Sequence, residues 1–166
     1  MLSLLRRVAA VFALLGSAIA LGAGLMVVTS IVLRTATSRP IQGDVELTQF
    51  AIAIAISLAL PWCQLRGGNI IVDFFTQRLP ARANLTLDAL GSLLVAAMCA
   101  LLAWRTTVGA LAVREASETS MILSLPMWWV YASLAPGLAL AAVVALVQAS
   151  LQLHGRSPDE LAGTGS

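Results

Sequence analysis

Residues 8–33 read VAAVFALLGSAIALGAGLMVVTSIVL, an uncharged run between Arg7 and Arg34. A helix needs about 20 mostly apolar residues to cross about 30 Å of hydrocarbon, so this stretch predicts a membrane span. The run also resembles a secretory signal, because Arg6 and Arg7 precede it and small residues occur at positions 18–20. The apolar core of a signal has only about 7–15 residues. This run is longer and continues past any plausible cleavage site, so we expect a retained helix.

The composition of the whole chain agrees with a membrane protein. Its 166 residues are 59% hydrophobic and 11% charged, with a mean hydropathy of +0.91. An average soluble domain has about 25% charged residues, so polar material is too scarce here to cover a water-facing globule. The net charge is +2, and the ten basic residues, all arginine, form no basic run. These values exclude a soluble enzyme, a disordered tail and a nucleic-acid-binding domain.

Three further spans are expected, at residues 47–65, 85–108 and 127–151. Together with residues 8–33 they predict an all-α integral membrane protein with four transmembrane helices. We expect one membrane domain over residues 1–155, followed by a polar cytoplasmic tail over residues 156–166.

A short amphipathic helix is expected between the second and third spans, at about residues 69–79. Gly67 and Gly68 interrupt the preceding span, and Pro80 ends the pattern. The apolar residues fall on one face of a helical wheel and are Ile70, Ile71, Phe74, Phe75 and Leu79. The segment is too short to span, but it is typical of a helix in the headgroup plane. A plain loop is the alternative.

Aromatic residues and arginines indicate where the spans end and how they are oriented. All four tryptophans, Trp62, Trp104, Trp128 and Trp129, fall near predicted span ends, where the ring can reach the headgroups. With the N-terminus in the cytoplasm, six arginines lie inside and four outside. The inner set is Arg6, Arg7, Arg66, Arg78, Arg82 and Arg156, and the outer set is Arg34, Arg39, Arg105 and Arg114. This bias predicts that both termini are cytoplasmic.

Small residues recur at four-residue steps in every span. The sets are Gly16, Ala20 and Gly24; Ala51, Ala55 and Ala59; Ser92, Ala96 and Ala100; and Gly137, Ala141 and Ala145. Such stripes allow close approach of helix backbones in lipid and predict packing faces. An alanine-rich chain also produces them by chance, so both interpretations stay open.

The predicted spans carry no charge at their centres. A coupled carrier usually needs an intramembrane ionisable residue. The only histidine, His154, is in the tail, which argues against haem held by two histidines and against a histidine-rich metal site. Cys63 and Cys99 are single cysteines in separate apolar stretches, unlike the cysteine pairs of a thiol oxidase. We expect no catalytic, cofactor-binding or metal-binding residues, and a hydrophobic subunit that works with another protein.

Three stretches carry a family resemblance. They are GDVEL at residues 43–47, LPWCQLRGGNIIVD at residues 60–73, and ETSMILSLPMWWVY at residues 118–131. Their order and spacing, over about residues 6–151, resemble the DctQ-like small membrane subunit of the tripartite ATP-independent periplasmic (TRAP) transporters. One departure is Asn69, where the family often has histidine.

The resemblance implies a complex in the bacterial inner (cytoplasmic) membrane. A periplasmic solute-binding protein would capture an organic acid-type solute, and a large many-spanning permease subunit would move it inward with sodium. The small subunit would be a non-catalytic scaffold that braces the large subunit and helps dock the binding protein. The rival hypotheses are an autonomous small four-span oligomeric carrier, which would need a central ionisable residue, and a membrane oxidoreductase, which would need cysteine pairs or haem.

Nine residues are candidates for contact with a partner or with lipid. They are Arg34, Arg39, Asp44, Glu46, Arg66, Asp73, Arg114, Trp128 and Trp129. For Asp44 and Glu46 the alternative is an acidic helix start favoured by the helix dipole. For the outer arginines it is solvated loop charge. Arg66 and Asp73 border the expected in-plane helix and are candidates to pair with each other or to meet lipid headgroups.

Overall fold

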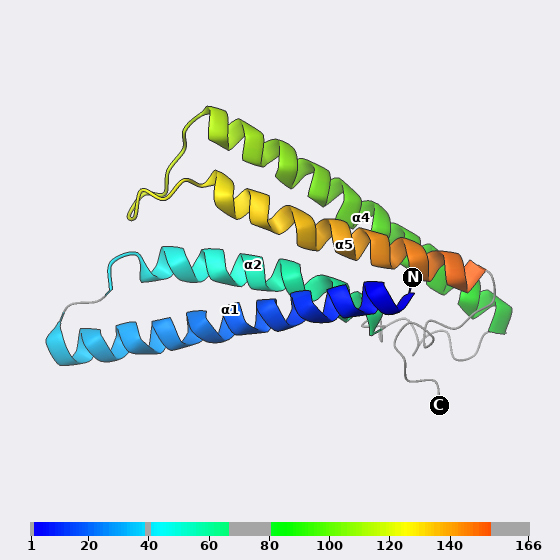
Figure 1. The fold of residues 1–166 in the computed structure, drawn as a ribbon, viewed down its shortest axis with the longest axis horizontal. Helices are drawn as coiled ribbons and strands as arrows, with labels where there is room; N and C mark the ends of the chain where they lie inside the picture. The colour runs from blue at the N-terminus through cyan, green and yellow to red at the C-terminus, as the bar shows by residue number, and fades with distance from the viewer. Residues whose placement is uncertain (1, 39–40, 67–80, 154–166) are drawn as a thin grey trace.

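The computed structural model describes residues 2–38, 41–66 and 81–153. These residues form four helices (Figure 1): α1 (Leu2–Thr37), α2 (Asp44–Leu65), α4 (Ala81–Glu115) and α5 (Trp128–Leu153). All four are long and apolar enough to cross a membrane, which confirms the predicted all-α class with four candidate spans. The expected in-plane helix at residues 69–79 and the tail at residues 156–166 lie outside the described residues.

The helices α1 and α4 are longer than the spans predicted within them. α4 has 35 residues, which at about 1.5 Å per residue makes it longer than the hydrocarbon layer is thick. The segment after Arg105 contains no proline, so the helix continues to Glu115. Trp104 therefore lies about three turns before the end of α4, although it is near the end of the predicted span.

The helices lie in a row whose order is α1, α2, α5, α4 (Figure 1). α2 packs against both α1 and α5, and α5 packs against α4. The chain thus forms two helix pairs, α1 with α2 and α4 with α5, which meet at the α2–α5 contact. The molecule also has two ends along the helix axes. The end that carries Glu46, at the start of α2, is named the Glu46 end. The end that carries Arg66, just after α2, is named the Arg66 end.

The face of α1 that meets α2 repeats every seven residues. Its most buried positions are Ala9, Gly16, Ala23 and Ser30. A seven-residue repeat is 3.5 residues per turn, the period of helices that cross at a shallow left-handed angle. The close approach is clearest at Gly16, where a Cβ atom would lie 2.8 Å from the carbonyl oxygen of Ala55.

Beyond Gly16, the small-residue stripe of α1 does not meet α2. Ala20 and Gly24 are exposed, and a Cβ on Gly24 would meet no atom within 4 Å. Each four-residue step advances about 40° around a helix, so two steps leave the face that a seven-residue repeat keeps. In α5, by contrast, Gly137, Ala141 and Ala145 are all buried, because that helix has neighbours on two sides.

Two small clusters form the interior of the row. Near the Arg66 end, Ala9, Leu65 and Val144 bring α1, α2 and α5 together. Farther along, Cys99 of α4 packs with Ala141 and Ala142 of α5. The side chains are mostly small, so the helices are held by close backbone approach more than by a large hydrophobic core.

Candidate interaction surfaces and their internal anchors

The two acidic candidates at the start of α2 both bind groups of their own chain. Ser30 Oγ, on α1, donates a hydrogen bond to Asp44 Oδ2 (2.5 Å), and the Val45 amide donates to Asp44 Oδ1 (2.7 Å). Glu46 reaches the connection between α4 and α5, where Ser120 Oγ donates to its Oε2 (2.9 Å). Asp44 therefore fastens α1 to α2, and Glu46 fastens α2 to the second helix pair.

The segment that Glu46 holds is a compact loop, residues 119–127, named the Glu46 loop. Thr119 and Pro126 form an antiparallel bridge at its base. The amides of Ile122 and Leu123 donate to the two carboxylate oxygens of Glu46, at 3.2 and 3.1 Å. A carboxylate that accepts several hydrogen bonds in a partly buried position holds its donors firmly. The loop is thus attached to the start of α2 as well as to α4 and α5.

Gly43 provides the space for this attachment. Its φ angle is +76°, in the left-handed region that favours glycine. A Cβ atom at Gly43 would lie 2.5 Å from Cγ of Leu123. Both the backbone conformation and the contact with the Glu46 loop therefore require glycine before α2.

Three further candidates lie together at the Glu46 end. The guanidinium carbon of Arg114 lies 5.3 Å from the ring centroid of Trp128. The rings of Trp128 and Trp129 pack edge to face, with centroids 5.6 Å apart. A cation over an aromatic face is a favourable contact, so the end of α4 and the start of α5 stabilise each other here.

The remaining candidates are separate from these groups. Arg34 is exposed in the last turn of α1. Arg66 follows the last residue of α2 at the opposite end of the row, with its guanidinium carbon 5.2 Å from the ring centroid of Trp62. Arg39 and Asp73 lie outside the described residues. The structure therefore brings together part of the predicted set and leaves Arg34 and Arg66 apart from it.

A set of buried polar contacts between α2 and α5 was missed by the sequence analysis. These contacts, made by Ser57, Gln64 and Gln148, are named the polar seam. Ser57 Oγ donates to the carbonyl oxygen of Leu134 (2.7 Å). Gln64 Nε2 donates to Gln148 Oε1 (2.9 Å), while Gln148 Nε2 donates to the Gln64 carbonyl oxygen (2.8 Å). The seam thus joins the two helix pairs by side-chain hydrogen bonds.

A similar contact joins the two helices of the second pair. Ser92 Oγ on α4 donates to Gln152 Oε1 on α5 (2.9 Å), and both side chains are buried. In an apolar medium a buried polar side chain without a partner is costly, so such pairs favour one arrangement of the helices. Their signal in the sequence is uncharged polar residues within apolar spans. The search for charges alone passed over it.

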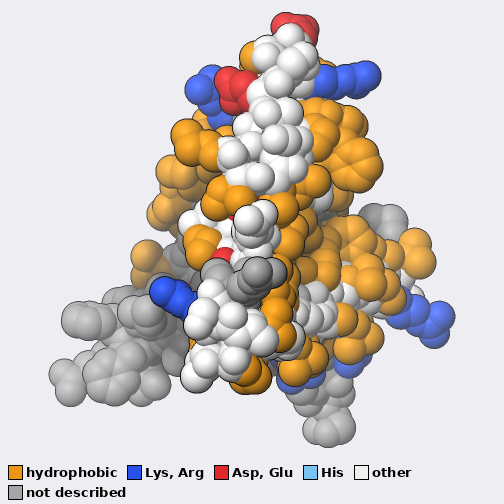
Figure 2. Space-filling view, turned by 90° about the vertical axis from the view of Figure 1, so that its left-hand side faces the viewer, with side chains coloured by type: hydrophobic (Ala, Val, Ile, Leu, Met, Phe, Trp, Pro, Cys, Tyr) orange, Lys and Arg blue, Asp and Glu red, His pale blue; other side chains and the backbone are white. Residues whose placement is uncertain are grey.

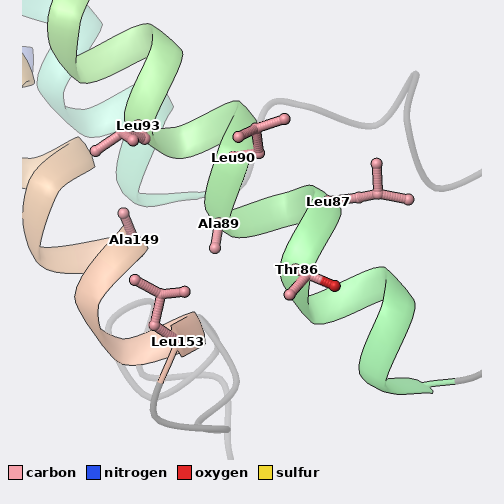
Figure 3. Close-up of a pocket in the computed structure, with 7 residues that line it drawn as sticks. All are labelled: Thr86, Leu87, Ala89, Leu90, Leu93, Ala149 and Leu153. Atoms are coloured by element: carbon pink, nitrogen blue, oxygen red, sulfur yellow. The ribbon is translucent and has the colours of Figure 1, made fainter.

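A lipid-facing or partner-facing surface surrounds these internal contacts. Figure 2 faces the Glu46 end, with hydrophobic side chains on both flanks and acidic and basic side chains gathered near the α4 side at the top. An apolar pocket of about 430 Å³ lies between α4 and α5 near the Arg66 end (Figure 3). Its lining includes Leu87, Leu90, Leu93 and Leu153, with the Thr86 hydroxyl as the one side-chain oxygen among the labelled residues.

The described part of the chain has no grouping suited to metal binding. Over residues 2–38, 41–66 and 81–153, no three His, Cys, Asp or Glu residues lie close enough to hold an ion. Cys63 is exposed on α2, and Cys99 is buried on α4, and neither forms a disulfide. The polar side chains that make the contacts described above are hydroxyls, amides, carboxylates and arginines, and these contacts hold the helices together.

Comparison with known proteins adds one match. The model of the family described as "Tripartite ATP-independent periplasmic transporters, DctQ component" matches residues 23–155. The matched region contains the C-terminal part of α1, from residue 23, and all of α2, α4 and α5. No curated protein and no solved structure matches the chain.

Proposed function

The chain belongs to the DctQ component family of the tripartite ATP-independent periplasmic transporters, and on this premise we propose that it is the small subunit that braces the large permease subunit. In this proposal it is non-catalytic and helps dock the periplasmic solute-binding protein. The complex imports an organic acid-type solute together with sodium, and the solute and sodium are bound by the other subunits.

The observation that carries the proposal is the family match over residues 23–155. The row of helices supports it, because a row leaves far more apolar surface uncovered than a closed bundle does. Large exposed side chains line both edge helices: Leu14, Leu21, Leu25 and Val28 on α1, and Leu94, Met98, Leu101 and Leu111 on α4. Apolar surface of this extent is suited to lipid and to another membrane subunit.

We place the chain in the bacterial inner membrane with both termini in the cytoplasm. Arg6, Arg7 and Arg66 lie at the Arg66 end. Because arginines are more frequent on the cytoplasmic side of a membrane protein, we assign the Arg66 end to the cytoplasm. The Glu46 end then faces the periplasm. A reporter fused after Ser166 is expected to read as cytoplasmic, and a periplasmic signal would reverse the orientation.

The candidate residues take two kinds of role in this proposal. Arg34, Arg39 and Arg114, with Trp128 and Trp129, contribute to the periplasmic contact surface, where exposed arginines would steer an acidic partner. Asp44 and Glu46 act indirectly, since their carboxylates are held within the chain and shape that surface. The role proposed for Arg66 and Asp73 is contact with lipid headgroups on the cytoplasmic side.

Co-purification tests the proposed assembly. The tagged chain, expressed with a large TRAP permease subunit of the same organism, is purified in a mild detergent and analysed by native mass spectrometry. A stable complex of the two proteins is expected. An unrelated four-span protein with the same tag is the control. Recovery of the tagged chain alone, in homo-oligomers, would contradict the scaffold proposal and favour an autonomous carrier.

A further inference from the structure

We propose that the Glu46 loop is a membrane-interface anchor, whose apolar tip enters the boundary between headgroups and acyl chains of the leaflet at the Glu46 end. The tip consists of Met121, Ile122 and Leu125. The proposal concerns contact with lipid and does not depend on the role in a transporter.

The tip exposes apolar side chains on a connection between helices. Met121 is 100% exposed, Ile122 is 59% exposed and Leu125 is 39% exposed. Connections that lie in water are usually polar, and exposed apolar groups gathered at one place mark a surface that contacts something apolar. Neither α4 nor α5 covers these three side chains.

Six backbone amides of the same loop donate hydrogen bonds within the chain. The amides of Ile122 and Leu123 donate to Glu46, and the Leu125 amide donates to Ser120 Oγ (3.2 Å). Three more amide donors have backbone acceptors: Ser120 to Leu125, Ser124 to Ser120, and Met127 to Glu118. A segment in contact with hydrocarbon must satisfy its backbone groups internally. The loop meets that requirement for these donors, because Glu46 and Ser120 supply acceptors.

The position of the loop along the row favours lipid as the occupant. The hydrogen bond between Ser30 and Asp44 places Ser30 of α1 level with the start of α2, to which the loop is attached. Beyond Ser30, α1 continues with exposed Ile31 (59%), Val32 (59%) and Leu33 (42%) before Arg34. Figure 1 shows the end of α1 reaching farther out than the loop. The apolar surface of α1 thus extends beyond the level of Ser30 and of the start of α2.

The surroundings of the tip continue this apolar boundary. Trp129, at the start of α5, is 64% exposed, and Arg114 lies against its neighbour Trp128. Tryptophan with a nearby arginine is typical of the headgroup level. Trp129 and the tip thus both expose apolar surface at the Glu46 end, as expected for groups at a membrane interface.

Spin labels test the depth of the tip in a bilayer. The full chain carries Cys63→Ser and Cys99→Ala, with a label introduced by Met121→Cys, and is placed in nanodiscs of phosphatidylethanolamine and phosphatidylglycerol. Collision with oxygen, which concentrates in hydrocarbon, is compared with collision with a water-soluble nickel chelate. Glu118→Cys, on the exposed base of the loop, is the matched water-facing control, and Val32→Cys is the lipid-facing control.

The label at position 121 is expected to resemble that at position 32, with an oxygen-to-nickel collision ratio several-fold above that at position 118. A ratio equal to that at position 118 would place the tip in water and overturn the proposal. Shielding from both reagents would also overturn it, because the tip would then be covered by protein. Unchanged circular dichroism of the labelled variants shows that the helices have formed.

Discussion

The two contacts of α2 differ in what holds them. Toward α1, the contact consists of small residues at seven-residue intervals, and its hydrogen bond, between Ser30 and Asp44, lies at one end. Toward α5, the contact contains Ser57 in mid-helix and the reciprocal Gln64–Gln148 pair. The first contact depends on shape, whereas the second also depends on matching donors and acceptors.

The difference follows from what each contact must specify. α1 and α2 are consecutive in the chain, so a short connection already makes them neighbours. α2 and α5 come from different helix pairs, and in lipid an apolar surface alone does not select its partner, because lipid is equally apolar. Buried amide and hydroxyl pairs favour one partner and one register. The polar seam is therefore expected to define how the two pairs assemble.

Gly137→Leu should have the largest effect, because it attacks the α2–α5 contact at its closest point. A Cβ at position 137 would overlap both the carbonyl oxygen and Oγ of Ser57. The change both overpacks the contact and breaks the Ser57 hydrogen bond. We expect a loss of about 3 kcal/mol in the free energy of helix separation, measured by SDS titration in mixed micelles.

The matched control for this substitution is Gly91→Leu on α4. A Cβ at Gly91 would meet no atom within 4 Å. The same change of residue type in a helix should there leave the free energy nearly unchanged. Equal losses in the two variants would show that α5 does not approach α2 closely at Gly137.

Gly16→Leu should be the next most damaging, because it attacks the α1–α2 contact. A Cβ at position 16 would lie 2.8 Å from the Ala55 carbonyl oxygen. α1 is at the edge of the row and can shift outward, so we expect a loss of about 2 kcal/mol in the same titration. Gly24→Leu, at an open position of the same helix, is the control. A larger loss at position 24 than at position 16 would contradict the seven-residue repeat.

Gln148→Leu tests the polar part of the seam. It removes both hydrogen bonds to Gln64 and leaves the buried Gln64 amide without this partner. We expect a loss of about 1 kcal/mol. The double variant Gln64→Leu with Gln148→Leu should lose less than the sum of the single changes, because no unpaired amide remains. Strictly additive losses would mean that the two glutamines do not interact.

Ser57→Ala should have the smallest effect. It removes the hydrogen bond to the Leu134 carbonyl oxygen and leaves the helix backbones at the same distance. Hydrogen bonds between membrane helices average about 0.6 kcal/mol, so a loss of this size is expected. Thr107→Ala, at an exposed hydroxyl bonded within its own helix, is the control and should change the free energy less. A larger loss of free energy for Thr107→Ala than for Ser57→Ala would show that Ser57 does not stabilise the contact between α2 and α5.

The four helices could be predicted from the sequence because crossing a membrane requires long apolar segments. The predicted spans at residues 8–33, 47–65 and 85–108 all lie within observed helices. The order of the helices in the row could not be predicted. Neighbours such as Ser57 and Gly137 are far apart in the chain, and hydropathy contains no information about which helices touch. The small-residue stripe of α1 meets α2 only at Gly16, because the four-residue steps of the stripe and the seven-residue steps of the contact share that position and diverge after it.

The candidate surface was also predictable only in part, because the sequence does not show which helices are neighbours. Glu46 and Trp128 lie at the starts of α2 and α5, as the sequence indicated, whereas Arg114 lies in the last turn of α4, beyond the predicted span. That Glu46 holds the loop at Ser120 follows from the α2–α5 neighbourhood, which no local pattern encodes. Gln64 and Gln148 carry no charge, so a search for intramembrane charges could not find them.

Reconstituted uptake tests most directly the central claim that this chain braces a transporter whose other subunits move the solute. Proteoliposomes would contain the large subunit alone, this chain alone, both together, or both with Gly137→Leu, each supplied with the binding protein, a sodium gradient and the solute that stabilises that protein. We expect sodium-driven uptake only when both wild-type subunits are present, and a much lower rate with Gly137→Leu. Uptake by this chain alone, or the full rate without it, would show that the chain is not a bracing subunit.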